Sequence, residues 1–185
     1  MSQHPFIIVG IGFSAGGLTA IQEIVSGLPP LTGMAIVIIQ HFKPKIKSEL
    51  AQILAQHSNN RVCEISHDMS ITENIIFIAP SGVGIEVRKT FKVTPCGPTR
   101  SSNIDCLLRS IAETQGSRSA AVILSGLLSD GSEGVRLIKN AGGVTIVQFP
   151  ETAKFDSMPQ SAIDTGCVDF VLSPKEIADK LSCLK

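Results

Sequence analysis

Short runs of apolar residues alternate along the chain with longer segments in which apolar residues recur every three or four positions. Residues 34–39 form an apolar run without a polar residue, as expected of a strand that is buried on both faces of a parallel sheet. Residues 17–26 instead place aliphatic side chains on one face of a helix, which Pro29 and Pro30 prevent from continuing. The pattern therefore predicts β-strands and amphipathic α-helices in alternation.

The same pattern predicts the order of the elements. Strands are expected over residues 6–9, 34–39, 74–79, 84–87, 91–93, 120–124 and 144–147. Helices are expected over about residues 17–26, 46–57, 104–114, 133–141 and 174–183. The middle strands are short and joined by tight turns, which favours antiparallel pairing there. Overall the alternation predicts an α/β fold in one domain over residues 1–185: a doubly wound, mostly parallel sheet with flanking helices and a short antiparallel element in the middle.

Composition excludes several classes of function. Apolar residues make up 43% of the chain and charged residues 17%, which indicates a folded domain and not a disordered segment. The 16 basic and 16 acidic residues cancel, and the chain has neither Trp nor Tyr, so it offers nucleic acid neither a charged surface nor a stacking platform. Its longest apolar runs are shorter than the roughly 20 residues that a membrane-spanning helix needs, so no membrane insertion is expected.

The cysteines and the N-terminus indicate a cytoplasmic protein. The chain has five widely spaced cysteines, without a C-x-x-C pair and without a cluster at zinc-ligand spacing. Such cysteines are typical of reduced thiols in a reducing compartment. The first residues lack the basic and then apolar layout of a signal peptide. We expect neither a metal site nor a cofactor.

Polar side chains follow three of the predicted strands, at the carboxyl end of each. Ser14 lies in the turn G-F-S-A-G-G after the first strand, His41 ends the second, and Asp130 lies in a Ser/Gly/Asp turn after the strand at residues 120–124. The carboxyl ends of parallel strands meet at one edge of the sheet, where folds of this class build their sites. We therefore expect these three side chains to lie close together.

A serine, a histidine and a carboxylate are the groups that nucleophilic ester hydrolysis needs. The imidazole of His41 would remove the proton of the Ser14 hydroxyl during attack, and the carboxylate of Asp130 would hold the imidazole in the required tautomer. The glycines around Ser14 allow a sharp turn from strand to helix, where backbone N–H groups could stabilise an oxyanion. The chain order Ser, His, Asp differs from the order in α/β-hydrolases, so the ordinary α/β-hydrolase fold is not expected.

Each feature also has an interpretation without catalysis. The Gly-rich turn could be a turn only, His41 a strand-end residue bonded to the backbone, and Asp130 a turn or helix-capping residue. Asp105 is expected to be a first-turn residue that favours the helix dipole. Residues 10–16 approximate a dinucleotide-binding loop, but that hypothesis requires an acidic residue at the end of the second strand, where Gln40 and His41 stand. A catalytically silent signalling or interaction module of this fold is the third hypothesis.

Several motifs in one order resemble the catalytic domain of the bacterial chemotaxis protein-glutamate methylesterases. They are the turn around Ser14, the Gln40-His41 pair, I-A-P at residues 78–80, S-G-x-x-x-D-G at 125–131, A-G-G at 141–143 and M-P-x-x-A-I at 158–163. The resemblance, over about residues 7–181, implies hydrolysis of γ-glutamyl methyl esters on the cytoplasmic helices of chemoreceptors, and in some members deamidation of receptor glutamines. It also implies that Ser14 is the nucleophile, His41 the general base and acid, and Asp130 the orienting carboxylate.

The chain departs from the family's pattern at several positions. Family members often carry Met-Gly where this chain has Leu127-Leu128. This difference bears on the backbone geometry and on the oxyanion stabilisation beside Asp130. The family's Gly-Met-Pro-Arg is represented by S-M-P-Q at residues 157–160, which removes one positive charge near the expected substrate face. The segment around Arg100 resembles methylesterase domains fused to methyltransferase and sensory domains, so such domains are candidate partners in a larger protein.

The commonest members of the family also carry an N-terminal phosphoacceptor domain that covers the site. No such receiver domain is expected within residues 1–185, because the first strand begins at residue 6. The sequence is therefore expected to be either an excised piece of a larger protein or a stand-alone enzyme that is regulated differently. In both cases we expect activity without phosphorylation.

Overall fold

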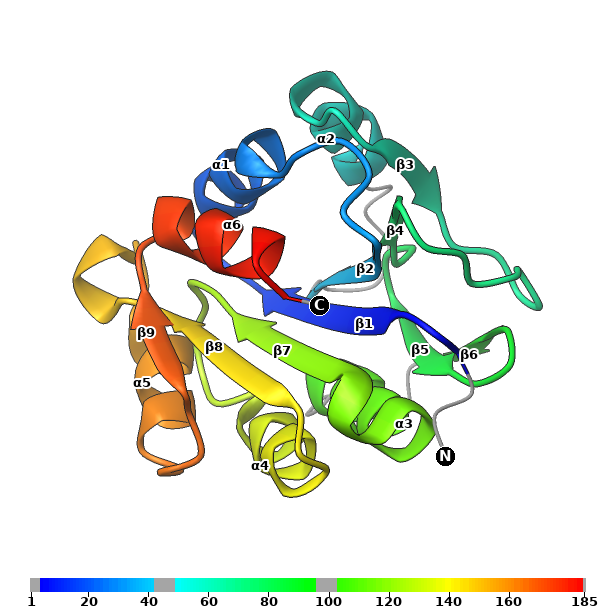
Figure 1. Cartoon of the computed structure of the whole chain (residues 1–185). Coiled ribbons are helices and arrows are strands. Elements are labelled where there is room, and N and C mark those ends of the chain that lie inside the picture. Colours follow the sequence, from blue (N-terminus) through cyan, green and yellow to red (C-terminus); the bar gives the residue numbers. More distant parts are fainter. Residues whose placement is uncertain (1–3, 42–48, 96–102, 185) are drawn as a thin grey trace.

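The computed structural model describes residues 4–41, 49–95 and 103–184, which form a central sheet between two layers of helices (Figure 1). The main sheet has seven strands in the order β3-β4-β2-β1-β7-β8-β9, and all neighbours in it are parallel. The strands of the described chain are β1 (Ile7–Phe13), β2 (Met34–Gln40), β3 (Arg61–Glu64), β4 (Ile75–Ile78), β5 (Val83–Val87), β6 (Phe91–Pro95), β7 (Ser119–Ile123), β8 (Val144–Gln148) and β9 (Phe170–Leu172). The predicted doubly wound α/β fold is confirmed.

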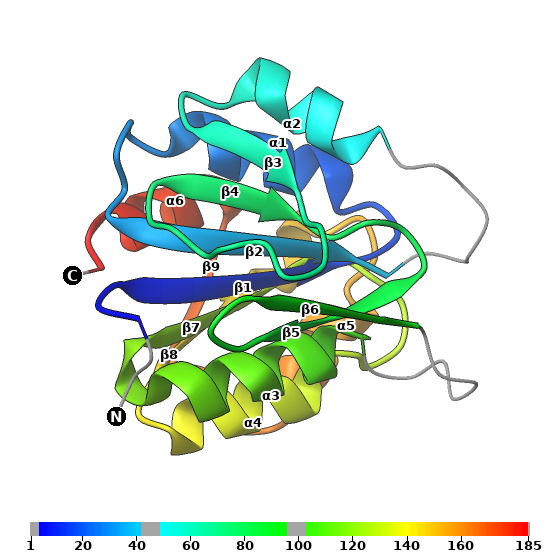
Figure 2. The same ribbon diagram turned by 90° about the vertical axis from the view of Figure 1, so that its right-hand side faces the viewer.

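The helices cover both faces of the sheet. Figures 1 and 2 show α1, α2 and α6 on one face and α3, α4 and α5 on the other. Their bounds are α1 (Leu18–Gly27), α2 (Leu50–His57), α3 (Asn103–Gln115), α4 (Ser132–Asn140), α5 (Ser157–Ile163) and α6 (Pro174–Ser182), with 3-10 turns η1 (Gly116–Arg118) and η2 (Pro150–Thr152). A separate cluster of buried apolar side chains lies under each helical layer. Among the described helices, none is long and apolar enough to cross a membrane.

Strand β1 lies between β2 and β7, and the winding of the fold reverses there. The connection that leaves β1 passes through α1 on one face, whereas the connection that leaves β7 passes through α4 on the other (Figure 2). The crevice at such a reversal is the usual place for a site in a doubly wound sheet. Phe13 pairs with Gln40, and Gly12 with Ile123, so β1, β2 and β7 end at nearly the same level.

Two glycines inside β1 allow α3 to pack closely on the sheet. A Cβ atom on Gly10 would lie 2.6 Å from a side-chain carbon of Leu108, and one on Gly12 would lie 2.4 Å from a side-chain carbon of Ile104. The first predicted strand consequently extends to Phe13, through most of the segment that approximates a dinucleotide-binding loop. These glycines serve the packing of a helix, and only a short turn remains before α1.

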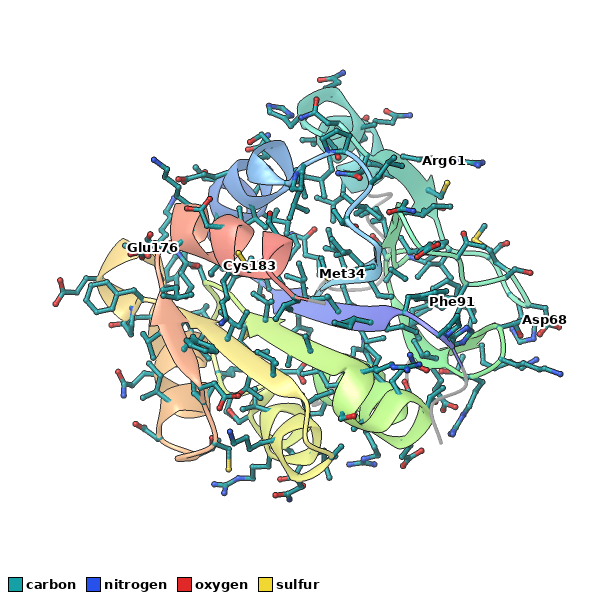
Figure 3. The ribbon with its side chains drawn as sticks, viewed as in Figure 1. Met34, Arg61, Asp68, Phe91, Glu176 and Cys183 are labelled. Atoms are coloured by element: carbon teal, nitrogen blue, oxygen red, sulfur yellow. The ribbon has the colours of Figure 1, made fainter. Side chains whose placement is uncertain are left out.

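The predicted antiparallel element is the β5–β6 hairpin, which packs on α3. Ser110 Oγ accepts a hydrogen bond from the Val87 N–H (2.9 Å), and Thr114 Oγ1 donates to the Val87 carbonyl (2.9 Å). Phe91, labelled in Figure 3, packs edge-on against Phe77 of β4 with 4.9 Å between the ring centroids. The hairpin is therefore joined both to α3 and to the main sheet.

Most predicted elements agree with the observed bounds to within one or two residues. The structure adds β3, β9 and α5, which were not predicted. β3 is a half-exposed edge strand, β9 has three residues, and α5 contains Pro159 in its first turn, so all three give a weak pattern. The predicted start of the second helix, at residue 46, lies outside the described residues, and α2 begins at Leu50.

Candidate active site

The turn that carries Ser14 is short and closely constrained. Ser14 directly follows β1, and α1 begins at Leu18. The Gly17 N–H donates to the Ser14 carbonyl (3.2 Å), which closes the turn. Gly16 has a φ of +74°, and a Cβ atom there would lie 2.6 Å from Lys154 Cβ, so this position requires glycine. The turn leaves Ser14 half-buried at the carboxyl edge of the sheet.

Ser125, two residues beyond the end of β7, joins three loops around this turn. Its carbonyl accepts from the Ser14 N–H (2.9 Å), and its hydroxyl donates to the Ala15 carbonyl (2.9 Å). The same hydroxyl accepts from the Phe155 N–H (3.0 Å). The loops after β1, β7 and β8 are thus fixed relative to one another. Sequence reasoning missed this role, although the Ser-Gly pair at this position directly follows a predicted strand.

His41 lies beside Ser14 because β1 and β2 are neighbours in register. The His41 N–H donates to the Phe13 carbonyl (2.9 Å), which continues the pairing by one residue beyond the strands. The Ser14 hydroxyl donates to the His41 carbonyl, with 3.4 Å between the two oxygens. The structure therefore brings these two predicted residues into contact through the backbone of His41, which is itself half-buried.

Asp130 is buried at the same edge, where it caps α3. Its Oδ2 accepts from the Ile104 N–H (3.2 Å) and its Oδ1 accepts from the Asp105 N–H (3.1 Å). The first N–H groups of a helix lack partners within the helix and favour negative charge, so they hold the carboxylate in place. Among the described residues, no hydrogen bond joins this carboxylate to Ser14 or His41.

Asp105 has a role that the sequence did not indicate. Its Oδ1 accepts from the Gly134 N–H in the first turn of α4 (2.7 Å). Asp130 precedes α4 and caps α3, whereas Asp105 belongs to α3 and caps α4. Each helix start is therefore capped by a carboxylate from the segment that forms the other helix start. Burial raises the pKa of Asp105 above its ordinary value, and the negative charge of Asp130 adds to this against the opposing hydrogen bond from Gly134.

The loop after β7 passes directly against the serine turn. A Cβ atom on Gly126 would lie 3.0 Å from Ser14 Cβ and 2.5 Å from Met158 Sδ, so only glycine allows this approach. The Gly126 N–H donates to the Phe155 carbonyl (3.0 Å), and the Gly126 carbonyl accepts from the Met158 N–H (3.0 Å). Gly126 therefore holds the start of α5 against Ser14.

Several backbone N–H groups near Ser14 have no protein acceptor in the part of the chain that the structure describes. Among them are those of Ala15, the next residue along the chain, and of Leu127, which follows Gly126. Donors of this kind at a strand-to-helix turn can stabilise the negative oxygen of a tetrahedral intermediate. Leu128 has a φ of +70°, a left-handed backbone conformation that usually requires glycine.

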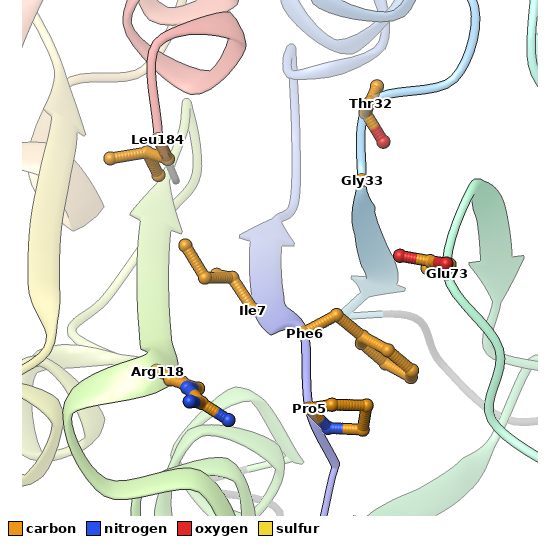
Figure 4. A pocket seen from close by; sticks show the side chains of 8 residues that line it. All are labelled: Pro5, Phe6, Ile7, Thr32, Gly33, Glu73, Arg118 and Leu184. Atoms are coloured by element: carbon orange, nitrogen blue, oxygen red, sulfur yellow. The ribbon is translucent and has the colours of Figure 1, made fainter.

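A cavity of about 280 Å³ lies away from this site, at the amino end of the sheet (Figure 4). It is lined by Pro5, Phe6, Ile7, Thr32, Gly33, Glu73, Arg118 and Leu184. Its lining residues lie before or at the start of β1, before β2, β4 and β7, or after α6, whereas Ser14 follows β1. The cavity is thus separated from Ser14 by the length of the strands.

A parallel sheet whose winding reverses beside a turn at its carboxyl edge defines a doubly wound α/β domain with its site at that edge, and this chain belongs to that class. Within the class, a family model described as CheB methylesterase matches residues 9–181, and the chain is a member of that family. The resemblance inferred from the motifs is thereby confirmed.

Known relatives match nearly the whole chain. The crystal structure of the Thermotoga maritima CheB methylesterase catalytic domain has a TM-score of 0.89 and 30% identity, and the match covers 97% of this chain and 98% of that chain. A protein of Leptospira interrogans is 36% identical over 173 residues, which are 91% of this chain and 90% of that protein. Protein-glutamate methylesterase/protein-glutamine glutaminase 1 of Carboxydothermus hydrogenoformans is 34% identical over 190 residues; the match covers 95% of this chain but 54% of that relative.

Proposed function

We propose that this chain hydrolyses γ-glutamyl methyl esters on the cytoplasmic helices of chemoreceptors, and that it acts in chemotaxis adaptation in the cytoplasm. One observation carries the proposal: in a member of the methylesterase family, Ser14 stands in a glycine-closed turn at the carboxyl edge with its hydroxyl against His41. The second activity in the name of the Carboxydothermus relative supports deamidation of glutamine as a further reaction of the same site.

We assign Ser14 as the nucleophile and His41 as the general base. Ser14 Oγ attacks the ester carbonyl carbon while the His41 ring accepts the hydroxyl proton, and the imidazolium then protonates the departing methoxide, which leaves as methanol. Water activated by His41 releases the glutamate and restores Ser14. The ring must turn toward Ser14 Oγ, and hydrogen bonds of catalytic pairs often tighten only when substrate is bound. The backbone contact between the two residues supports this assignment.

Asp130 is assigned as the carboxylate that orients the His41 ring and stabilises its charged form. An ionised carboxylate offers about four lone-pair sites, and the α3 amides use two of those on Asp130. The remaining sites are available to an imidazole N–H. Because two backbone amides already hold the Asp130 carboxylate in place, it would orient the His41 ring without any further ordering of its own side chain.

The N–H groups of Ala15 and Leu127 are assigned to the oxyanion. Both are close to Ser14, one along the chain and one through the contact of Gly126 with Ser14. Fixed donors stabilise a tetrahedral intermediate without reorganisation, and loss of one such donor in other hydrolases costs roughly 10²–10³-fold in rate. The left-handed backbone at Leu128 supports this role, because it sets the direction of the chain after Leu127.

Methanol release from a methylated chemoreceptor tests the proposed reaction. Ser14→Ala should lower the rate by roughly 10⁴-fold or more, because the hydroxyl is the nucleophile. Ser129→Ala is the matched control: Ser129 is an exposed serine in the same loop as Asp130, and this variant should keep the rate of the parent chain. Methanol release that survives in Ser14→Ala contradicts the assignment. A folded parent chain that releases no methanol would instead indicate the silent signalling module.

A further inference from the structure

The backbone of Leu128 is unusual for its residue type. Its φ of +70° lies in the left-handed region, which is unfavourable for a residue with a branched apolar side chain. The other described non-glycine residues with positive φ are Leu31, Asp68 and Asn74, and the last two are of the types that tolerate this conformation. Leu128 is in addition 70% exposed, so packing within the described chain does not compensate for the strain.

Helix α5 holds Leu128 in this conformation. The Leu128 carbonyl accepts from Ser157 Oγ (3.2 Å) and from Ser161 Oγ (3.5 Å), which are one turn apart on α5. Strained backbone persists only where the surrounding structure imposes it, and such positions are concentrated at functional sites. These contacts fix the direction in which the exposed leucine leaves the loop.

Leu128 belongs to an apolar rim beside the reacting serine. We define the rim as Leu127, Leu128 and Phe155, whose exposed fractions are 49%, 70% and 36%. Gly126 connects the rim to the site, because its N–H donates to the Phe155 carbonyl (3.0 Å) and a Cβ atom on it would lie 3.0 Å from Ser14 Cβ. A polypeptide that places an ester at Ser14 therefore passes the rim.

We propose that Leu128 is a specificity-determining contact, which binds an apolar side chain on the same helical segment that carries the ester. This inference rests on the proposed function, because the occupant is the substrate of Ser14. On a helix, residues three and four positions apart share a face, so the matching residue would lie three or four positions from the esterified glutamate. The exposed leucine is covered only when such a substrate binds.

Binding of a helical receptor peptide with one glutamyl methyl ester tests the inference. Both chains compared carry Ser14→Ala, so that the peptide is not consumed. Leu128→Gly should weaken binding roughly tenfold, the effect of losing one buried leucine contact. It should also raise Tm by about 2 °C, because glycine relieves the left-handed backbone. Leu128→Met, which keeps an apolar side chain, should keep the affinity.

Leu31 supplies the matched control. It has a φ of +60°, is 79% exposed and precedes β2, at the opposite edge of the sheet. Leu31→Gly should raise Tm by a similar amount and leave the dissociation constant unchanged. A peptide with serine in place of its apolar residue should bind the Leu128→Gly chain and its parent equally, if the two side chains contact each other.

The outcomes separate this inference from the proposed function. An unchanged dissociation constant in Leu128→Gly, or an equal loss in Leu31→Gly, overturns the contact and leaves the hydrolysis intact. Leu128-dependent binding by a chain that hydrolyses no ester overturns the proposed function and keeps the contact. If the peptide does not bind even at millimolar concentration, the contact is refuted.

Discussion

Single residues at the carboxyl edge are held mainly through their backbones. The N–H of Ser14 donates to Ser125, and the N–H of His41 donates to Phe13. Neither residue therefore depends on its side chain for its position. Substitutions at Ser14 and His41 should leave the fold unchanged, so that a loss of activity reports on the chemistry.

The Ser14 and His41 side chains should act as a unit. We expect His41→Ala to lower methanol release nearly as much as Ser14→Ala, and the double variant to lose no more than the larger single loss. Thermal unfolding should give Tm values within about 2 °C of the parent chain, since the backbone hydrogen bonds that hold both residues are kept in the alanine variants. A double variant whose loss is the product of the two single losses would contradict the assignment of His41 as the base of Ser14.

For single residues, the sequence predicted contacts between residues that directly follow strands. It did not predict which side chains cap helices. The contact of Ser14 with His41 was predictable, because both follow neighbouring parallel strands. The bonds of Asp130 to the start of α3 were not, because the partners lie 25 and 26 residues away and meet only when α3 packs against the sheet. The cap of Asp105 on α4 depends on the same packing.

Two elements, α3 and α4, are coupled by the carboxylates that they exchange. Asp105→Ala removes the acceptor for the Gly134 N–H and should lower the free energy of unfolding by about 1–2 kcal/mol, the usual cost of losing a helix-capping side chain. Asp105→Asn keeps an acceptor oxygen and removes the charge. Its stability relative to the parent chain should depend on pH.

The direction of that dependence follows from the raised pKa of Asp105, which burial causes in the first place. Between the ordinary pKa of 3.8 and the raised pKa, the folded chain binds more protons than the unfolded chain, so the contribution of Asp105 to stability falls as pH rises. Urea unfolding from about pH 3 to pH 7 should therefore show Asp105→Asn gaining stability relative to the parent chain as the pH rises. A stability difference that is constant over this range, or that moves the other way, would contradict this account of Asp105.

The helices differ in how far the local pattern of apolar residues determines their bounds. Helices α1 and α3 carry long apolar stripes and were predicted nearly to their ends. Helix α5 has seven residues, and its start is held from outside by the bond from the Met158 N–H to the Gly126 carbonyl. Its position therefore depends on a tertiary contact, which apolar periodicity does not encode.

The whole molecule places Ser14, His41 and Asp130 at one edge because every strand of the main sheet is parallel. The loops after β1, β7 and β8 meet there beside His41, which directly follows β2, and Ser125 joins the three loops. The fold class was predictable from the alternation of elements. The strand order was not, because the place of β1 between β2 and β7 results from long-range packing. Because of that order, the loop after β7 packs directly against Ser14.

The central claim is that Ser14 is an activated nucleophile, and covalent labelling by a fluorophosphonate tests it most directly. The folded chain should gain one label, located on Ser14 by peptide mass spectrometry. Ser14→Ala should gain none, and His41→Ala should react far more slowly because the hydroxyl has lost its base. A label on another residue, or a folded chain that hydrolyses the ester while Ser14 stays unlabelled, would contradict the account.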